Sequence, residues 1–237
     1  MQMLSSDLIS ELLLGMRLDG LHYNRIQISP PFGVRFGEDP TRAQFHFIAR
    51  GRVYLRTDSG VVHTLEAGDA VLLPRGGIHA LLSDPSIPCL DVTDYSVTTI
   101  CRRVDDIHAC KAEQCRSTDT LIFSGCMEFD LGGMHPLVSM MPEVMQVGTL
   151  IDRNPELLPV LEAMAREVST ERAGFAGILT RLADVVSASI VRDWVECGCG
   201  DAQGWVEALR DPRMGRVIAA IHRDPGRNWT VEMMASE

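Results

Sequence analysis

Long hydrophobic runs are missing from this 237-residue chain, and aromatic residues make up only 5% of it. Without 18 or more consecutive apolar residues, the sequence predicts no membrane-spanning helix. Basic residues are also scarce, since 22 lysines and arginines stand against 32 acidic residues and give a net charge of −10. Because affinity for polyanions depends on Lys and Arg, this excess of acid predicts that the chain alone binds nucleic acid poorly.

Signals for export and for disulfide bonding are scarce as well. The first 20 residues contain acidic side chains and no basic stretch ahead of their apolar residues, unlike a secretory signal peptide. The seven cysteines are an odd number at irregular spacing, which favours reduced thiols in the cytoplasm over a disulfide framework. An apolar fraction of 46% is nevertheless ordinary for a globular protein with a sizeable core.

Two hydrophobic periods follow one another along the chain. An apolar helical face after two serines predicts a helix over 5–20, and from 22 to 132 short apolar runs alternate with turn residues, as in an antiparallel sandwich or barrel. After residue 135 the period changes to about 3.6 residues, which is typical of helices. Strands that precede helices indicate an α+β fold with the helices segregated from the sheet. The expected later helices cover 155–168, 172–197 and 211–224.

The stretch 68–83, GDAVLLPRGGIHALLS, carries the most specific motif. Gly68 is expected in a turn before an apolar strand that Pro74 ends, and Gly76 begins the turn of a hairpin. His79 then opens the returning strand with its side chain pointing inward. This spacing resembles the second motif of the cupin fold, Gly-x5-Pro-x-Gly-x2-His-x3-Asn, with serine in place of the final asparagine. The resemblance implies a cupin-like antiparallel double-stranded β-barrel that encloses a pocket.

The first cupin motif, which supplies most metal ligands of cupin enzymes, is not matched. Aligned on Gly51, its glutamate position falls on Gln44 and its two histidine positions fall in GEDP, which has no histidine. Of the four usual ligands only His79 remains, with His46 on the same strand face as Gln44. A barrel that binds a small ligand without catalysis is therefore preferred over the alternative, a metal-dependent cupin enzyme of the isomerase or dioxygenase type.

Gln44, His46, Arg50 and His79 are the candidate pocket residues. The two histidines could simply be hydrogen-bonded core residues. Contact with a ligand is an equally good interpretation, because polar groups inside an apolar pocket usually orient a ligand. Arg50 points inward if its strand is regular and could pair with an anionic ligand, although such side chains are more often solvated.

The order of a cupin-like barrel, helices and then the start of a capped helix resembles the regulatory half of AraC-type transcriptional regulators. The resemblance covers most of the chain and implies a sensor barrel with an N-terminal helix (1–134), a helical dimerisation or linker region (135–224) and the start of a helix-turn-helix domain (225–237). It also implies that this DNA-binding domain is cut off within its first helix. The stretches that carry it are FHFIARGRVYLRT, LEAGDAVLLPRGGIHAL, GCMEFDLGGMHPLVSMMPEVMQV and LRDPRMGRVIAAIHRDPGRNWTVEMMASE.

In that family the barrel senses a small molecule or a chemical stress, and the helices after it dimerise. The resemblance therefore implies the sensing and dimerisation portion of a cytoplasmic transcription regulator, a homodimer with a small-molecule effector. The candidate interface is an apolar stripe along the helix expected over 172–197, whose alternative role is to pack on the barrel. The stripe consists of Phe175, Ile178, Leu182, Val185, Val186 and Trp194.

Thiol and imidazole side chains gather in the stretch DDIHACKAEQCRS. Such groups at short spacing can hold Zn²⁺, and a loop of this length could fold over the ion. Nearby basic residues could instead favour a thiolate that oxidants attack, and a third possibility is an ordinary exposed loop. The candidate zinc ligands are His108, Cys110, Cys115 and Cys126.

Overall fold

The computed structural model describes residues 17–37, 42–110, 118–130, 141–149, 153–197, 211–224 and 226–236, together with positions 138 and 151. Most of the helix expected over 5–20 lies outside these residues. Its last part is wrong, because the chain from Arg17 onward is a strand.

The chain divides into two compact units. The larger unit, Leu18–Glu128 and Pro142–Ile190, contains the β-sheets, helix α3 (Leu158–Thr170) and most of helix α4 (Phe175–Cys197). The smaller unit includes the helices α6 (Pro212–Arg223) and α7 (Val231–Ala235). The division at residues 134 and 224 that the family resemblance implies stays a prediction.

Two sheets form the larger unit. The large sheet has the strand order β12-β6-β3-β11-β1-β10-β9, and the small sheet has the order β5-β4-β7-β2-β8. Most neighbouring strands are antiparallel, whereas β1–β10 and β2–β8 are parallel. The strands are β1 (Arg17–Ile28), β2 (Gly33–Phe36), β3 (Ala43–Arg50), β4 (Val53–Thr57), β5 (Val62–Leu65), β6 (Ala70–Leu73), β7 (His79–Leu82), β8 (Leu90–Asp91), β9 (Val97–Cys101), β10 (Val104–Ala109), β11 (Thr120–Asp130) and β12 (Met145–Gln146).

The core lies between the two sheets and takes side chains from both. Strand β4 alternates buried and half-buried residues, as a strand with one face on the core does. Strands β6 and β7 are buried along their whole length; β6 is apolar throughout, and β7 is apolar after His79. Core members of the large sheet include Ile26, Ile48 and Ile122, and those of the small sheet include Leu55 and Leu81.

The hairpin expected over 68–83 is wrong in one respect. The chain does turn after β6, where Gly76 and Gly77 have φ angles of 56° and 85° that glycine adopts readily. Yet β6 pairs with β3 in the large sheet, whereas β7 pairs with β2 and β4 in the small sheet. The segment is therefore a corner between the sheets. It closes the barrel by joining them, and His79 at the start of β7 is buried as expected.

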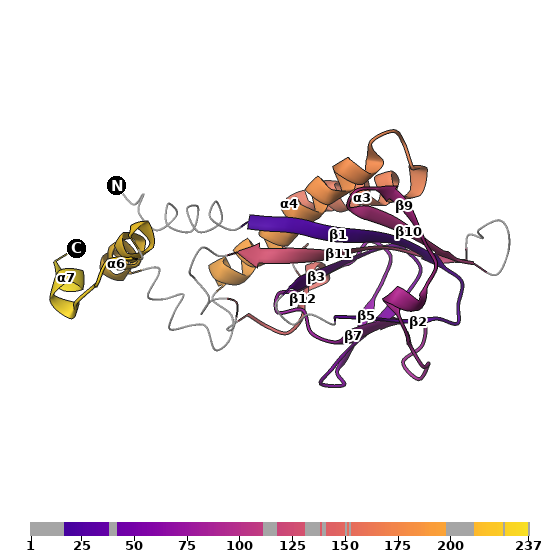
Figure 1. Ribbon diagram of the computed structural model, residues 1–237, viewed down its shortest axis with the longest axis horizontal. Coiled ribbons are helices and arrows are strands. Elements are labelled where there is room, and N and C mark those ends of the chain that lie inside the picture. Colours follow the sequence, from indigo (N-terminus) through magenta and orange to yellow (C-terminus); the bar gives the residue numbers. More distant parts are fainter. Residues whose placement is uncertain are drawn as a thin grey trace. The chain divides into compact units, whose positions relative to one another are not determined.

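Helices cover the outer face of the large sheet. Figure 1 shows α3 and the first part of α4 along β1 and β11, on the side away from β2, β5 and β7. The expected helices over 155–168 and 172–197 are confirmed as the short 3-10 turn η3 (Pro155–Leu157), α3 and α4. The helix expected over 211–224 is confirmed as α6, and Asp211 caps it by accepting from the backbone N–H groups of Arg213 and Met214.

Strand β1 separates two environments. Asn24 and Ile26 face the barrel interior, since the former lines a pocket there and the latter belongs to the core. Tyr23 and Arg25 point the other way, because they bond to Asp184 of α4 and to Val168 of α3. This alternation is the ordinary period of a strand, and it gives β1 one face toward the barrel and one toward the helices.

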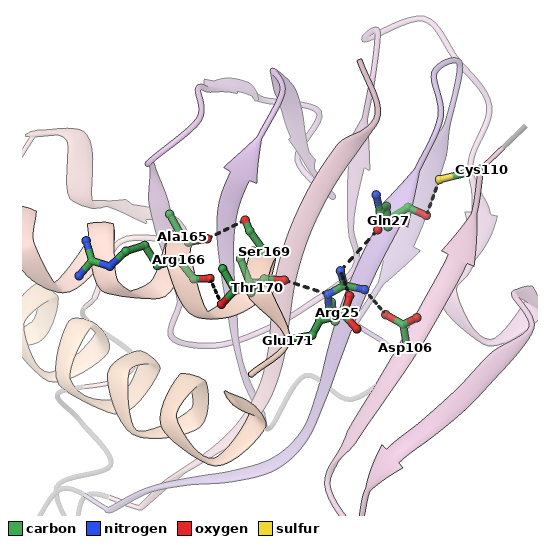
Figure 2. A network of polar contacts seen from close by, with 10 residues as sticks. Arg25, Gln27, Asp106, Cys110, Ala165, Arg166, Ser169, Thr170 and Glu171 are labelled. Atoms are coloured by element: carbon green, nitrogen blue, oxygen red, sulfur yellow. Dashed lines mark hydrogen bonds and ion pairs between the residues drawn. The ribbon is translucent and has the colours of Figure 1, made fainter. Parts of the chain in front are cut away.

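The Arg25 side chain fastens helix α3 to the sheet (Figure 2). Its Nε donates to the carbonyl oxygen of Val168 at 3.0 Å, which satisfies one of the unpaired carbonyls at the helix end. The other guanidinium nitrogens reach Asp106 Oδ1 of β10 at 2.8 Å and Glu171 Oε1 at 2.6 Å. Arg25 is 5% exposed, and Glu171 ends the helix with a left-handed φ of 46°. The buried Arg25 guanidinium thus binds the carboxylates of Asp106 and Glu171 and the C-terminal end of α3.

We expect Arg25→Gln to lower the free energy of unfolding by about 2 kcal/mol. The change removes a buried charge and leaves the Asp106 carboxylate and the Val168 carbonyl without their donor, but Glu171 remains open to water. Urea unfolding followed by circular dichroism measures the loss. The matched control is Arg52→Gln, because the Arg52–Glu66 pair is exposed on both sides and should contribute little. Equal midpoints for the two variants would refute the fastening role.

Candidate functional site

Two histidines meet inside the barrel and join its two sheets. His46 of β3 and His79 of β7 place their Nε2 atoms 2.7 Å apart, within hydrogen-bond distance. Their exposed fractions are 0% and 2%. The ring of Phe36, from β2, stacks on His79 at a centroid distance of 5.5 Å and lies tilted against His46 at 5.0 Å. The predicted inward direction of both histidines is therefore found, and they contact each other directly.

The outer ring nitrogens have partners that determine the direction of this bond. His79 Nδ1 lies 2.8 Å from the carbonyl oxygen of Gly77, and a carbonyl can only accept. His79 Nδ1 therefore carries the proton, and the Nε2 of a neutral His79 must accept from His46. His46 then has its proton on Nε2, so its Nδ1 accepts from the Ser124 hydroxyl at 2.8 Å. The chain of donors runs from Ser124 through His46 and His79 to Gly77.

Burial keeps both rings neutral. Loss of hydration lowers the pKa of His46 well below 6.5, and the neighbouring His79 lowers it further. Desolvation also lowers the pKa of His79 to about 4, although the bond to the Gly77 carbonyl opposes the shift. Two neutral rings satisfy all three contacts, whereas two imidazolium rings could not bond to each other, because an imidazolium has no acceptor nitrogen.

A small pocket adjoins the Ser124 end of this chain. Its volume is about 150 Å³, and its lining includes the polar side chains of Asn24, Gln44, Ser124 and Cys126 beside the Phe36 ring. Gln44 and Ser124 are 7% and 2% exposed. The remaining lining residues are His22, Gly37, Val92 and Gly125. The predicted pocket residues Gln44 and His46 thus lie at this site, the first in its wall and the second one hydrogen bond behind it.

The histidine pair does not have the geometry of a metal centre. Two nitrogen ligands of one tetrahedral Zn²⁺ ion lie about 3.3 Å apart at ordinary metal–nitrogen distances. The two Nε2 atoms are closer than that, at 2.7 Å. Within the described part of the chain, no group of three or more His, Cys, Asp and Glu side chains is placed to hold an ion. The donor set therefore fits a hydrogen-bonded pair and not the metal site of a cupin enzyme.

Arg50 and the cysteine-rich stretch lie elsewhere. Arg50 is half-buried at the end of β3, and its Nε donates to the carbonyl oxygen of Asp119 at 2.9 Å. Cys110, at the end of β10, points its thiol at the Gln27 carbonyl, 3.7 Å away. Cys126 lines the barrel pocket, and His108 is exposed on β10. Cys115 is outside the described residues, so a zinc ion held by this set stays a prediction.

The predicted dimerisation stripe divides between two faces of α4. Phe175, Val186 and Trp194 are buried within the chain. Ile178 and Val185 are 46% and 50% exposed, and Leu182 between them is partly exposed. One part of the stripe therefore packs inside the protein, and the other part remains exposed, where it could form an interface.

Ser124 and Phe36 belong to the site but were not among the predicted residues. Both sit in apolar strand patterns, where a serine or a phenylalanine looks like an ordinary core or turn residue. Ser124 is opposite His46 in the β11–β3 register. The inward alternation of β11 could have indicated Ser124, but only once the strand pairing was known.

Comparison with known proteins agrees with this barrel. The family model described as "Cupin" matches residues 7–196. The chain belongs to this cupin family. The cupin-like α+β fold predicted from the 68–83 motif is therefore confirmed, including the helices that follow the strands.

Relatives of this cupin family member are named as transcription regulators. The HTH-type transcriptional regulator AlkR of Acinetobacter baylyi is 27% identical over 194 residues, which cover 81% of this chain and 62% of that protein. A protein of Streptomyces lividans named as AraC-like is 25% identical over 206 residues, covering 86% and 64%. The chain thus spans under two thirds of each relative's length. The predicted resemblance to AraC-type regulators is confirmed.

The chain also matches a solved structure, ToxT from Vibrio cholerae O395, with 11% identity and a TM-score of 0.38. The match covers 91% of this chain and 68% of the ToxT chain. In addition, none of the helices in the described residues has the length and apolar run needed to cross a membrane.

We expect stability to fall as the pH drops from 7 to 5. In the unfolded chain both histidines bind a proton below about pH 6.5. In the folded chain the pKa of His79 is about 4, and the pKa of His46 lies well below 6.5, so neither ring is protonated at pH 5. Stability is therefore complete above pH 6.5 and is lost below it, by roughly 2 kcal/mol per histidine at pH 5.

Urea unfolding at the two pH values measures this loss. The double variant His46→Gln/His79→Gln, whose amides can still donate and accept, should show a much smaller loss. His63→Gln, which changes a histidine on the barrel surface, is the matched control and should behave as wild type. A wild-type chain equally stable at both pH values would contradict the assignment of two buried neutral rings.

Proposed function

We propose that this chain is the effector-sensing portion of an AraC-type transcription regulator and that the effector binds in the barrel pocket beside Ser124. Membership of the cupin family and the names of the relatives support the regulatory part of this proposal. DNA binding, in this account, is an activity of the whole regulator, which acts in the cytoplasm. With a net charge of −10, the 237 residues have little capacity to attract DNA by themselves.

The observation that carries the proposal is the hydrogen-bond chain that ends at the pocket. Ser124 donates to His46, and His46 donates to His79 on the opposite sheet. A ligand that engages the Ser124 hydroxyl competes for its proton and so changes a bond on which the orientation of both rings depends. Because the pair joins the two sheets, the ligand can favour one arrangement of the barrel over another.

The pocket selects for a small, uncharged and polar molecule. Its volume of about 150 Å³ corresponds to the liquid volume of roughly five waters. Amide groups of Asn24 and Gln44, the Ser124 hydroxyl and the Cys126 thiol offer donors and acceptors, while Phe36 offers an apolar surface. An ion placed here would lack a buried countercharge, since His46 behind the wall is held neutral.

Sensing rather than catalysis is the role that these groups support. The alternative, a metal-dependent cupin enzyme, would need a metal site in the barrel, and the histidine pair fits a hydrogen bond better than two ligands of one ion. The relatives, as named, are regulators.

A thermal-shift screen of the purified chain with small neutral metabolites tests the pocket. We expect at least one compound to raise the melting temperature, because a ligand that binds only the folded state stabilises it. Gln44→Met keeps the size of the side chain but removes its amide, and Ser124→Ala removes the hydroxyl. Both should reduce the shift, whereas Gln146→Met on β12 should not. Hits that stabilise all these variants equally would show that the pocket is not the receptor.

We also propose that the open face of α4 binds a second copy of the chain. Ile178, Leu182 and Val185 repeat at intervals of four and three residues, the spacing of an apolar seam between helices. Sedimentation equilibrium should show a dimer at micromolar concentration that Ile178→Glu/Val185→Glu converts to a monomer. Arg166→Glu, on the exposed side of α3, serves as a control for added negative charge. A wild-type chain that sediments as a monomer at all concentrations would exclude this interface.

A further inference from the structure

A second cleft lies on the opposite side of β1 from the barrel pocket. Its walls are the turn between β9 and β10, the outer face of β1 and the first turns of α4, all within the larger unit. Its volume of about 330 Å³ is at the lower end of the range for sites that hold small organic ligands, about 300–1,000 Å³. The polar and charged lining residues include Tyr23, Arg102, Arg103, Arg181 and Asp184.

Positive charge dominates this cleft although the chain as a whole is acidic. Arg102, Arg103 and Arg181 line it, against the single carboxylate of Asp184. Arg103 is held in place because its Nη1 donates to the carbonyl oxygen of Gly20 at 3.0 Å. Arg181 stands 3.9 Å from Asp184, with its side chain 82% exposed, so most of its guanidinium can turn toward an incoming ligand. A local excess of cations on a chain of charge −10 favours an anionic occupant.

The floor of the cleft is built around Tyr23. Its ring stacks on Phe123 at a centroid distance of 5.2 Å and is 1% exposed. Two glycines make room for it, because a Cβ on Gly20 or Gly125 would lie 2.1 or 2.6 Å from Tyr23 atoms. The hydroxyl donates its one proton to Asp184 Oδ1 at 3.4 Å, a long bond. Burial, reinforced by Asp184, raises the pKa of Tyr23, so the floor of the cleft stays uncharged.

Apolar groups surround the rest of the space. Val104 and Ala176 are buried there, and Gly177 leaves a gap, since a Cβ at this position would meet nothing within 4 Å. The cleft thus offers guanidinium groups at its rim and a phenol on an apolar floor. A ligand that matches it carries one anionic group and a short apolar body.

We propose that this cleft binds a small organic carboxylate, held by Arg103 and Arg181, with its apolar body above the buried Tyr23 and beside Val104 and Ala176. Guanidinium and carboxylate groups match in geometry and form strong charge-assisted hydrogen bonds. The carboxylate of Asp184 in the same cleft opposes a second negative charge, which favours a monoanion over a phosphate. The site is independent of the barrel pocket, because the residues that form it are on the other face of β1.

Isothermal titration calorimetry with 3-phenylpropionate tests the proposal, using 3-phenylpropionamide as its neutral counterpart and inorganic phosphate as an anion without an apolar body. We expect the carboxylate to bind with a Kd of about 1 mM or lower and the other two probes to bind at least about tenfold more weakly. The affinity should fall at higher salt, since the arginines are exposed.

Variants locate the binding. Gly177→Phe introduces a ring at a lining position where a Cβ would meet nothing within 4 Å, and it should abolish binding. Arg103→Gln/Arg181→Gln should weaken binding at least about tenfold. Arg52→Gln, a surface arginine far from the cleft in the fold, and Gln44→Met in the barrel pocket should leave it unchanged. The proposal fails if 3-phenylpropionate does not bind, if the amide or phosphate binds as tightly, if Gly177→Phe binds normally, or if Gln44→Met removes the binding.

Discussion

The hydrogen bond between His46 and His79 is the interaction on which the rest of this barrel depends. It crosses the interior from β3 of the large sheet to β7 of the small sheet, in a place that water does not reach. A buried donor without its acceptor costs about 1–3 kcal/mol, so neither ring can turn away without a penalty. The Gly77 carbonyl fixes the direction of the bond, and that direction passes through His46 to Ser124. The pocket is thereby connected to the contact that holds the sheets together.

Strand β1 connects the interior of the barrel to the helices outside it. Its inner face contributes Asn24 to the pocket, and its outer face contributes Tyr23 and Arg25 to contacts with the helices. A rearrangement of the large sheet would therefore reach the end of α3 through Arg25 and the middle of α4 through the Tyr23–Asp184 bond. Helix α4 also presents Ile178 and Val185 to solvent, so the helix that Tyr23 contacts is the one with an open apolar face.

The sequence predicted this architecture better than it predicted the chemistry. The spacing from Gly68 to His79 identified the cupin fold and placed His79 at the start of an inward strand, and the 3.6-residue period located α3 and α4. Strand partners are a tertiary property, which is why β6 and β7 were expected to pair although they belong to different sheets. The partners of His46 are 33 and 78 residues away in sequence, so no local pattern links the three side chains. Arg25 looks like a solvent-facing strand residue, and only the helices that cover the sheet make it a buried one.

The tautomers of the two rings test the central claim most directly. Multiple-bond ¹H–¹⁵N correlation spectra of the ¹⁵N-labelled chain at pH 7 distinguish protonated from bare ring nitrogens, and His46→Gln and His79→Gln assign the signals. The hydrogen-bond chain requires a neutral His46 with its proton on Nε2 and a neutral His79 with its proton on Nδ1. Spectra that show either ring as an imidazolium at this pH, or the protons on the opposite nitrogens, would contradict it.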